Sequence, residues 1–159
     1  MHVRTGIGYD SHRFATGGPL RLGGVDIPAD RHLVGHSDAD AICHAVTDAI
    51  LGAACLGDIG SMFPDTDPAN RGRDSIDMLE RAMGRVRQEQ RLHVEHVDIT
   101  VITESPKIGP FRDAISARIA DALGIPAGHV NVKAKTNEGM GWIGRGEGLA
   151  CIASATLMP

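Results

Sequence analysis

The sequence has very few aromatic side chains: its 159 residues include three Phe, one Tyr and one Trp. The core must therefore come mainly from Ile, Val, Leu and Ala, which bury less apolar area per side chain than aromatic residues do. We expect contacts between subunits to supplement such a core. With 42% hydrophobic and 23% charged residues and no linker or repeat, the chain has the composition of one globular domain spanning residues 1–159.

The sequence also lacks an excess of basic residues, a long apolar run and paired cysteines. A net charge of −4 provides no sequence-independent attraction for nucleic acid phosphates. The longest apolar run, residues 49–56, is far shorter than the ~20 residues of a membrane span, and residues 1–14 contain no apolar signal-peptide segment. Three cysteines without CxxC spacing are typical of free thiols, so we expect a cytoplasmic protein without nucleic acid or membrane partners.

Hydrophobic periodicity predicts strands and helices that alternate along the chain. The predicted strands cover residues 3–9, 93–103, 130–136 and 149–157, and a hairpin with a two-glycine turn covers residues 20–27. The predicted helices cover residues 38–56, 75–90 and 110–123, and a loop covers residues 58–67. This order favours an α+β fold with a mixed sheet of four to five strands and helices packed on one face.

The helix predicted at residues 38–56 has the clearest pattern. Ser37 followed by Asp40 matches a capping box at its start, and an apolar stripe runs through positions 42, 46, 49 and 53. Asp40, His44 and Asp48 lie on the opposite side of the helical wheel, which we expect to be polar.

Three residues have the side chains and spacing of a metal site. Asp10 and His12 are two positions apart just beyond a predicted strand, so both can point to one side, and His44 on a helix would supply a third ligand. Three such ligands with an open fourth position are typical of a catalytic zinc. Asp48 or Asp40 could orient His44. The alternative is a chance DxH sequence and a solvated helix face.

A second candidate site is the glycine-rich segment 135–148, which has five glycines within ten positions. It contains a GxGxxG pattern, but a predicted strand follows where a dinucleotide site needs a helix. Glycines allow backbone amides to approach phosphate oxygens, Thr136 offers a hydroxyl, and Glu138 could hold a hard cation. The alternative is a connection between strands that needs positive φ angles.

These segments together resemble the 2-C-methyl-D-erythritol 2,4-cyclodiphosphate synthase family of the non-mevalonate isoprenoid pathway, over essentially the whole chain. The matching motifs are residues 8–12, 36–40 with His44 and Asp48, 57–60, 63–67, 106–107 and 135–148. The resemblance implies a homotrimer with active sites between subunits. It also implies that Asp10, His12 and His44 bind zinc, and that Glu138 binds magnesium or manganese.

The resemblance further implies the substrate, a cytidine diphosphate compound. The enzyme would convert 4-diphosphocytidyl-2-C-methyl-D-erythritol 2-phosphate into the cyclodiphosphate and release CMP. The positions that match substrate-binding residues are Asp10, Ser11, His12, His36, Ser37, Asp58, Ile59, Gly60, Phe63, Pro64, Asp65, Thr66, Asp67, Thr103, Glu104, Ser105, Pro106, Lys107, Ile108, Gly109, Lys135, Thr136, Asn137, Glu138, Trp142 and Arg145. Residues 63–67 would line the erythritol pocket, and residues 103–109 of a neighbouring subunit would form the cytidine pocket.

The expected reaction agrees with the residues available. The sequence contains no evident Ser–His or Cys–His nucleophile pair, and none is needed if the substrate's own 2-phosphate attacks its β-phosphorus. The metal ions would act as Lewis acids, while His36 and Thr136 would donate hydrogen bonds to the transition state. Two alternatives remain: a metal-dependent phosphohydrolase with Asp48 or Asp65 as the base, and a non-catalytic trimeric module that binds nucleotides or isoprenoid diphosphates.

Overall fold

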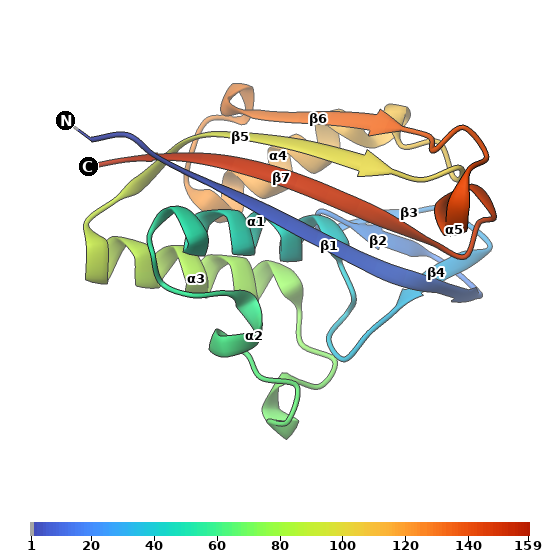
Figure 1. The fold of residues 1–159 in the computed structure, drawn as a ribbon, viewed down its shortest axis with the longest axis horizontal. Helices are drawn as coiled ribbons and strands as arrows, with labels where there is room; N and C mark the ends of the chain where they lie inside the picture. The colour runs from blue at the N-terminus through green and yellow to red at the C-terminus, as the bar shows by residue number, and fades with distance from the viewer. Residues whose placement is uncertain (1) are drawn as a thin grey trace.

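The computed structural model describes residues 2–159 and contains a five-stranded mixed sheet with helices on one face (Figure 1). The strands are β1 (Arg4–Thr16), β2 (Leu20–Leu22), β3 (Val25–Ile27), β4 (Arg31–Val34), β5 (His93–Ile102), β6 (Val130–Lys135) and β7 (Gly148–Met158). The helices are α1 (Ala41–Ala53), α2 (Ile59–Met62), α3 (Ser75–Gln90), α4 (Arg112–Leu123) and α5 (Gly141–Gly144).

The sheet has the order β4-β1-β7-β5-β6, in which only β5 and β6 pair in parallel. The strands β2 and β3 form a separate hairpin. The α+β class and the mixed sheet predicted from the sequence are confirmed. No helix of residues 2–159 has both the length and the apolar character needed to cross a bilayer.

The long pairing between β1 and β7 sets which side chains face the helices. Its register runs from Arg4 opposite Leu157 to Arg13 opposite Gly148. Because side chains alternate along a strand, the glycines at 6 and 8 face α1 together with Asp10 and His12. The predicted strand ended at residue 9, whereas β1 continues to residue 16, so Asp10 and His12 lie within the strand.

Helix α1 packs directly on the backbone of β1. A Cβ atom at Gly8 would lie 1.9 Å from the carbonyl oxygen of Ala45, and one at Gly6 would lie 2.1 Å from that of Ala49. No side chain can fit at these two positions while the helix keeps its place. This close approach brings α1 next to the inward-facing residues of β1.

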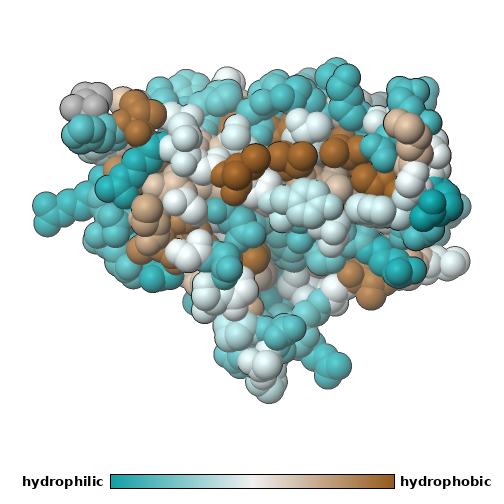
Figure 2. All heavy atoms as spheres, in the orientation of Figure 1, coloured by the Kyte–Doolittle hydropathy of each residue, from teal (hydrophilic) through white to brown (hydrophobic). Residues whose placement is uncertain are grey.

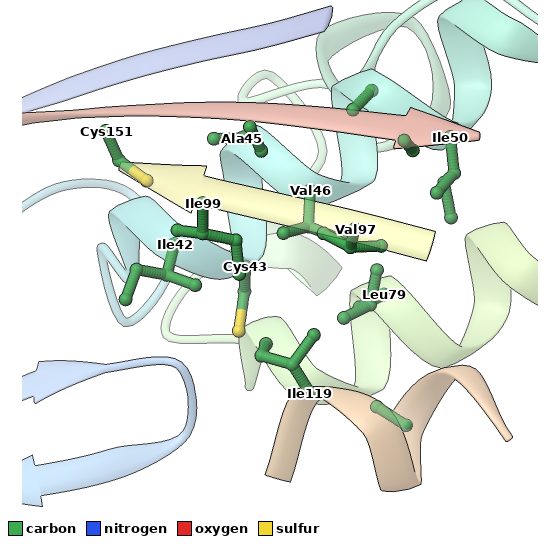
Figure 3. Close-up of a cluster of buried hydrophobic side chains, with 14 of the residues drawn as sticks. Ile42, Cys43, Ala45, Val46, Ile50, Leu79, Val97, Ile99, Ile119 and Cys151 are labelled. Carbon is green, nitrogen blue, oxygen red and sulfur yellow. The ribbon is translucent and has the colours of Figure 1, made fainter. Parts of the chain in front are cut away.

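The core surrounds most of α1. Figure 3 shows Ile42 and Val46 of α1 beside Val97 and Ile99 of β5, with Leu79 of α3 and Ile119 of α4 completing the cluster. The aliphatic composition of the core agrees with the scarcity of aromatic residues.

The polar side predicted for this helix is present, but it is largely buried. Asp40 and Thr47 are fully buried and His44 is 8% exposed, because α3 covers the surface of α1 that the sheet does not.

The start of α1 also differs from the prediction. The N-cap is Asp40, not Ser37, and its carboxylate accepts a hydrogen bond from the Cys43 amide at 3.1 Å. The same carboxylate accepts hydrogen bonds from the amides of Gly23 and Gly24 at 2.8 and 2.7 Å. Both glycines have positive φ, as the tight turn of the β2–β3 hairpin requires. The segment 58–67, predicted as a loop, contains the short helix α2, which Asp58 caps.

We expect Gly8→Ala to lower the free energy of unfolding by ~1–3 kcal/mol, because the new methyl group would push α1 away from β1. Urea denaturation measures this change. Gly84→Ala is the matched control, since nothing lies within 4 Å of a Cβ at this position inside α3. That variant should gain up to ~1 kcal/mol from helix propensity. An unchanged urea midpoint for Gly8→Ala would mean that the backbone contact does not constrain the fold.

Candidate metal centre and adjoining pockets

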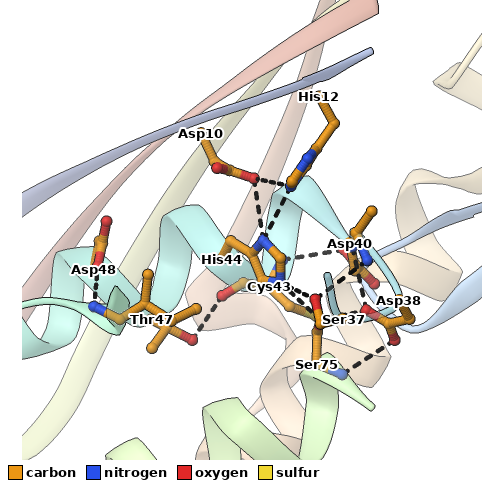
Figure 4. Close-up of polar contacts among 12 residues, drawn as sticks. Asp10, His12, Ser37, Asp38, Asp40, Cys43, His44, Thr47, Asp48 and Ser75 are labelled. Carbon is orange, nitrogen blue, oxygen red and sulfur yellow. Dashed lines mark hydrogen bonds and ion pairs between the residues drawn. The ribbon is translucent and has the colours of Figure 1, made fainter. Parts of the chain in front are cut away.

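Strand β1 and helix α1 bring Asp10, His12 and His44 together, as Figure 4 shows. Asp10 Oδ2 lies 2.9 Å from His12 Nε2 and 3.2 Å from His44 Nδ1. The two imidazole nitrogens lie 3.2 Å from each other. One carboxylate oxygen and two ring nitrogens thus form a nearly equilateral triangle at the surface of the core.

The triangle is slightly smaller than one face of a tetrahedral zinc coordination sphere. Zinc binds these atom types at about 2.0–2.2 Å, so two ligands of a tetrahedral site lie about 3.3–3.5 Å apart. Hydrogen bonds alone do not satisfy all three contacts. If His12 Nε2 and His44 Nδ1 both carry protons, the two N–H groups face each other. If either nitrogen lacks a proton, its lone pair faces the lone pairs of the Asp10 carboxylate. A cation at the centre of the triangle removes this conflict.

The second nitrogen of each imidazole has a partner that determines its tautomer. His12 Nδ1 donates to the backbone oxygen of Val34 in β4 at 3.1 Å, which leaves Nε2 free for a metal. His44 Nε2 lies 2.8 Å from Ser75 Oγ and 3.0 Å from Ser37 Oγ, which leaves Nδ1 free. The Ser75 hydroxyl in turn donates to Asp38.

The expectation that Asp48 or Asp40 orients His44 is wrong: Asp48 accepts a hydrogen bond from the Ile59 amide at 2.7 Å, and Asp40 binds the hairpin and the start of α1. The structure also contains a Ser–His contact that the sequence did not reveal. Ser75 is not a nucleophile, because it is fully buried and its proton points to Asp38.

The charges of the triad stabilise one another in the metal-free protein. Burial by itself raises the pKa of Asp10, but the hydrogen bonds and charges of His12 and His44 outweigh it and hold that pKa below its usual value of 3.8. Burial by itself lowers the pKa of His44, but the hydrogen bond and charge of Asp10 raise it above its usual value of 6.5. Asp10 and His44 therefore form an ion pair.

A cavity of about 150 Å³ lies beside the triad. Its lining residues are His12, His36, Ser37, His44, Ile59, Gly60, Phe63, Asp65, Asn70 and Met78. Six of them are predicted substrate-binding positions outside the triad. Pro64, Thr66 and Asp67 were predicted with Phe63 and Asp65 but are not among the lining residues.

Asn70 and Met78 were missed by the sequence analysis. They belong to the short 3-10 helix at Pro68–Asn70 and to α3, whose positions depend on tertiary packing and leave no local sequence signal.

A second pocket, of about 270 Å³, lies where β5 and β6 end. Its lining residues are Thr103, Glu104, Pro106, Lys107, Ile108, Gly109, Pro110, Ala134, Lys135 and Thr136. Nearly all of the predicted segment 103–109 is present, and only Ser105 is absent from the lining. This pocket shares no residue with the triad or its cavity. Glu138 is not part of the triad cluster either.

A third hollow, of about 210 Å³, also adjoins His12. Its lining residues are Ser11, His12, Arg13, Trp142, Glu147 and Gly148. Arg145 lies beside it and pairs with Glu147 at 2.7 Å. Arg13 was not predicted, although it lies two positions after Ser11 and so shares its face of β1.

An Asp–His–His cluster with a cavity beside it, on this α+β framework, forms a candidate metal site that a small molecule can reach. The sequence model of the YgbB family matches residues 3–158, and the chain belongs to this family.

Known relatives match over nearly the whole chain. The chain is 65% identical to the 2-C-methyl-D-erythritol 2,4-cyclodiphosphate synthase of Gemmatimonas aurantiaca, over 98% of this chain and 93% of that protein. Its fold is similar to a CDP complex of IspF from Plasmodium falciparum, with a TM-score of 0.86, 35% identity, and coverage of 99% and 96%. It is also similar to bifunctional IspDF from Campylobacter jejuni, with a TM-score of 0.94 and 42% identity. That match covers 98% of this chain but only 42% of the bifunctional protein.

The ion pair between Asp10 and His44 predicts how the stability of the metal-free protein depends on pH. The lowered pKa of Asp10 stabilises the fold above pH 3.8, and this stabilisation is lost as the pH falls through the folded-state pKa. The raised pKa of His44 stabilises the fold below pH 6.5, and this stabilisation is lost as the pH rises through the folded-state pKa. With a chelator present, the Tm difference between the native protein and Asp10→Asn should be largest between these two pH values. A pH-independent difference would contradict the ion pair.

Proposed function

We propose that this protein converts 4-diphosphocytidyl-2-C-methyl-D-erythritol 2-phosphate into 2-C-methyl-D-erythritol 2,4-cyclodiphosphate and CMP. The observation that carries the proposal is the Asp10–His12–His44 triangle beside an accessible cavity, in a chain that matches named synthases over nearly its full length. The three free cysteines and the family's metabolic role agree with a cytoplasmic enzyme.

The proposed cofactors are zinc at the triad and magnesium or manganese at Glu138. Bound metal ions would supply Lewis acidity and offset the negative charge of the diphosphate. The donor set of one carboxylate and two imidazoles suits zinc, and the partners of His12 Nδ1 and His44 Nε2 direct the opposite ring nitrogens toward the metal position. Zinc binding would displace the proton that His44 carries at Nδ1 in its ion pair with Asp10. The carboxylate of Glu138 is exposed and has only a long contact, at 3.4 Å, with the Thr136 hydroxyl. Oxygen ligands of this kind suit a hard divalent cation.

The side chains around the triad have the properties that ring closure requires. The substrate's 2-phosphate is already anionic, so the protein has only to align it with the β-phosphorus and the leaving CMP. His36 lines the cavity next to the triad and can donate a hydrogen bond to the reacting phosphate. We assign the same role to Thr136. The buried Cys43 and Cys151 cannot compete as nucleophiles, because burial raises the pKa of both thiols well above the usual range.

The pocket at the ends of β5 and β6 is the proposed cytidine site. Its lining combines apolar residues, which suit a nucleobase, with the basic residues Lys107 and Lys135, which suit a phosphate. The similar protein from Plasmodium falciparum is described as a CDP complex, which supports this assignment.

We further propose that the protein is a homotrimer whose active sites lie between subunits. The sheet face opposite the helices exposes Ile7 (73%), Tyr9 (57%) and Ile152 (36%) along β1 and β7. Figure 2 shows a band of hydrophobic atoms over these strands. Burying this band against other subunits would supplement the small aliphatic core. The cytidine pocket and the triad share no residue within one chain. In a trimer, the cytidine pocket of one chain could therefore lie next to the triad of the neighbouring chain.

The trimer proposal predicts that Ile7→Lys yields a folded monomer. Ile7 points away from the core, so a lysine at this position should not disturb the single chain but should prevent the exposed strands from packing together. Sedimentation velocity should report three chains for the native protein and one for the variant, whose turnover should be lost. Ile7→Val is the control and should remain trimeric. A native protein that sediments as a monomer would overturn this proposal without affecting the metal site.

The activity itself is tested by phosphorus NMR of the purified protein with zinc, magnesium and the cytidine substrate. We expect a cyclic diphosphate and CMP. His44→Ala should lose its zinc and at least ~10³-fold in turnover while keeping a cooperative unfolding transition. Linear phosphate products would instead indicate a phosphohydrolase, and binding without turnover would indicate a non-catalytic module. If His44→Ala keeps its zinc, the three-ligand site is wrong.

A further inference from the structure

The loop at residues 136–140 connects β6 to α5 and has an unusual backbone. Glu138 has a φ of +53°, and Gly139 follows with a φ of +72°. The left-handed region is unfavourable for a residue with a Cβ, so Glu138 keeps this conformation only if its surroundings hold it. The direction of the Glu138 side chain depends on that backbone conformation.

Contacts within the loop account for only part of this restraint. The Asn137 side chain donates to the Met140 carbonyl at 2.8 Å, and the Met140 amide donates to the Asn137 carbonyl at 2.9 Å. Gly144 of α5 packs against the backbone of Gly139, where a Cβ would lie 2.0 Å from the carbonyl carbon. These contacts hold the end of the loop, but none of them holds the amides on either side of Glu138.

Glu104, from the end of β5, makes those two contacts. Its Oε1 accepts hydrogen bonds from the Asn137 amide at 2.8 Å and from the Gly139 amide at 3.3 Å. The two amides bracket Glu138 and converge on one anionic oxygen, as in backbone anion-binding nests. The Thr103 amide extends the same connection by donating to the Lys135 carbonyl at 2.9 Å.

We infer that Glu104 is a positioning residue that fixes the 136–140 loop and thereby the direction of Glu138. Glu104 also lines the proposed cytidine pocket, with Lys135 and Thr136. One carboxylate therefore joins the nucleotide pocket to the proposed second metal ligand in a single rigid unit. The role assigned to Glu138 rests on the proposed function, but the effect of Glu104 on the loop does not.

The only tryptophan of the chain provides a readout that needs neither metal nor substrate. Trp142 lies in α5, two residues after Met140, and is 37% exposed. Glu104→Ala removes the acceptor, and Glu104→Asp keeps the charge but is one methylene too short to reach both amides. Both variants should increase quenching of Trp142 fluorescence by acrylamide. Glu104→Gln keeps an oxygen acceptor and should remain close to the native protein. Glu80→Gln, at an exposed position of α3, is the control.

The second readout is the metal requirement of turnover. Glu104→Ala and Glu104→Asp should raise the manganese concentration for half-maximal activity by roughly tenfold, because a charge-assisted hydrogen bond no longer selects the loop conformation. Their zinc content should not change. Glu138→Gln should also raise the manganese concentration for half-maximal activity, but it should not change the quenching of Trp142 fluorescence.

The results separate the two proposals. Quenching in Glu104→Ala and Glu104→Asp that equals that of the native protein would overturn the positioning role, whatever the activity. Increased quenching with an unchanged manganese requirement would overturn the link to Glu138. Absence of cyclic product from the native protein would refute the proposed function, while the quenching series would still test the effect of Glu104 on the loop.

Discussion

The close approach of α1 to β1 is the constraint on which the rest of the structure depends. Gly6 and Gly8 leave no space between strand and helix, so the backbone of α1 lies directly on the sheet. Further along β1, at the next alternate positions, the strand presents Asp10 and His12 to the same helix. His44 of that helix lies next to them. A larger residue at either glycine position would push α1 away from β1 and so move His44 away from Asp10 and His12.

The triad is then oriented by groups that serve the fold at the same time. Val34 supplies its carbonyl to His12 because β4 pairs with β1, and Ser75 reaches His44 because it begins α3. Asp38 accepts from the Ser75 hydroxyl and also from the Ser75 amide at 3.0 Å, which ties the start of α3 to the segment before α1. These contacts orient the imidazoles of the triad, which is the preorganisation that a tight metal site needs.

The sequence predicted those features that depend on local pattern. The period of β1 placed Asp10 and His12 on one face, and the apolar stripe identified α1 and the surface that packs on the sheet. It could not reveal that α3 would bury the other side of α1, since the covering residues lie more than twenty positions further along the chain. For the same reason the sequence favoured Asp40 and Asp48, one helical turn from His44, over the distant Ser75 as its partner. Long-range packing, not local periodicity, selects such neighbours.

The overall charge of −4 does not determine how the site attracts an anionic diphosphate. A uniformly acidic surface would repel an anionic diphosphate, but the charge of Asp10 at the triad is balanced by His44. Lys107 and Lys135 line the second pocket and carry positive charges. Because charges separated by more than about 10 Å are screened in salt, these local groups decide the attraction and the net charge does not. A divalent ion at the triad would add two positive charges where its ligands contribute a single carboxylate, so metal binding and diphosphate binding would favour each other through local electrostatics.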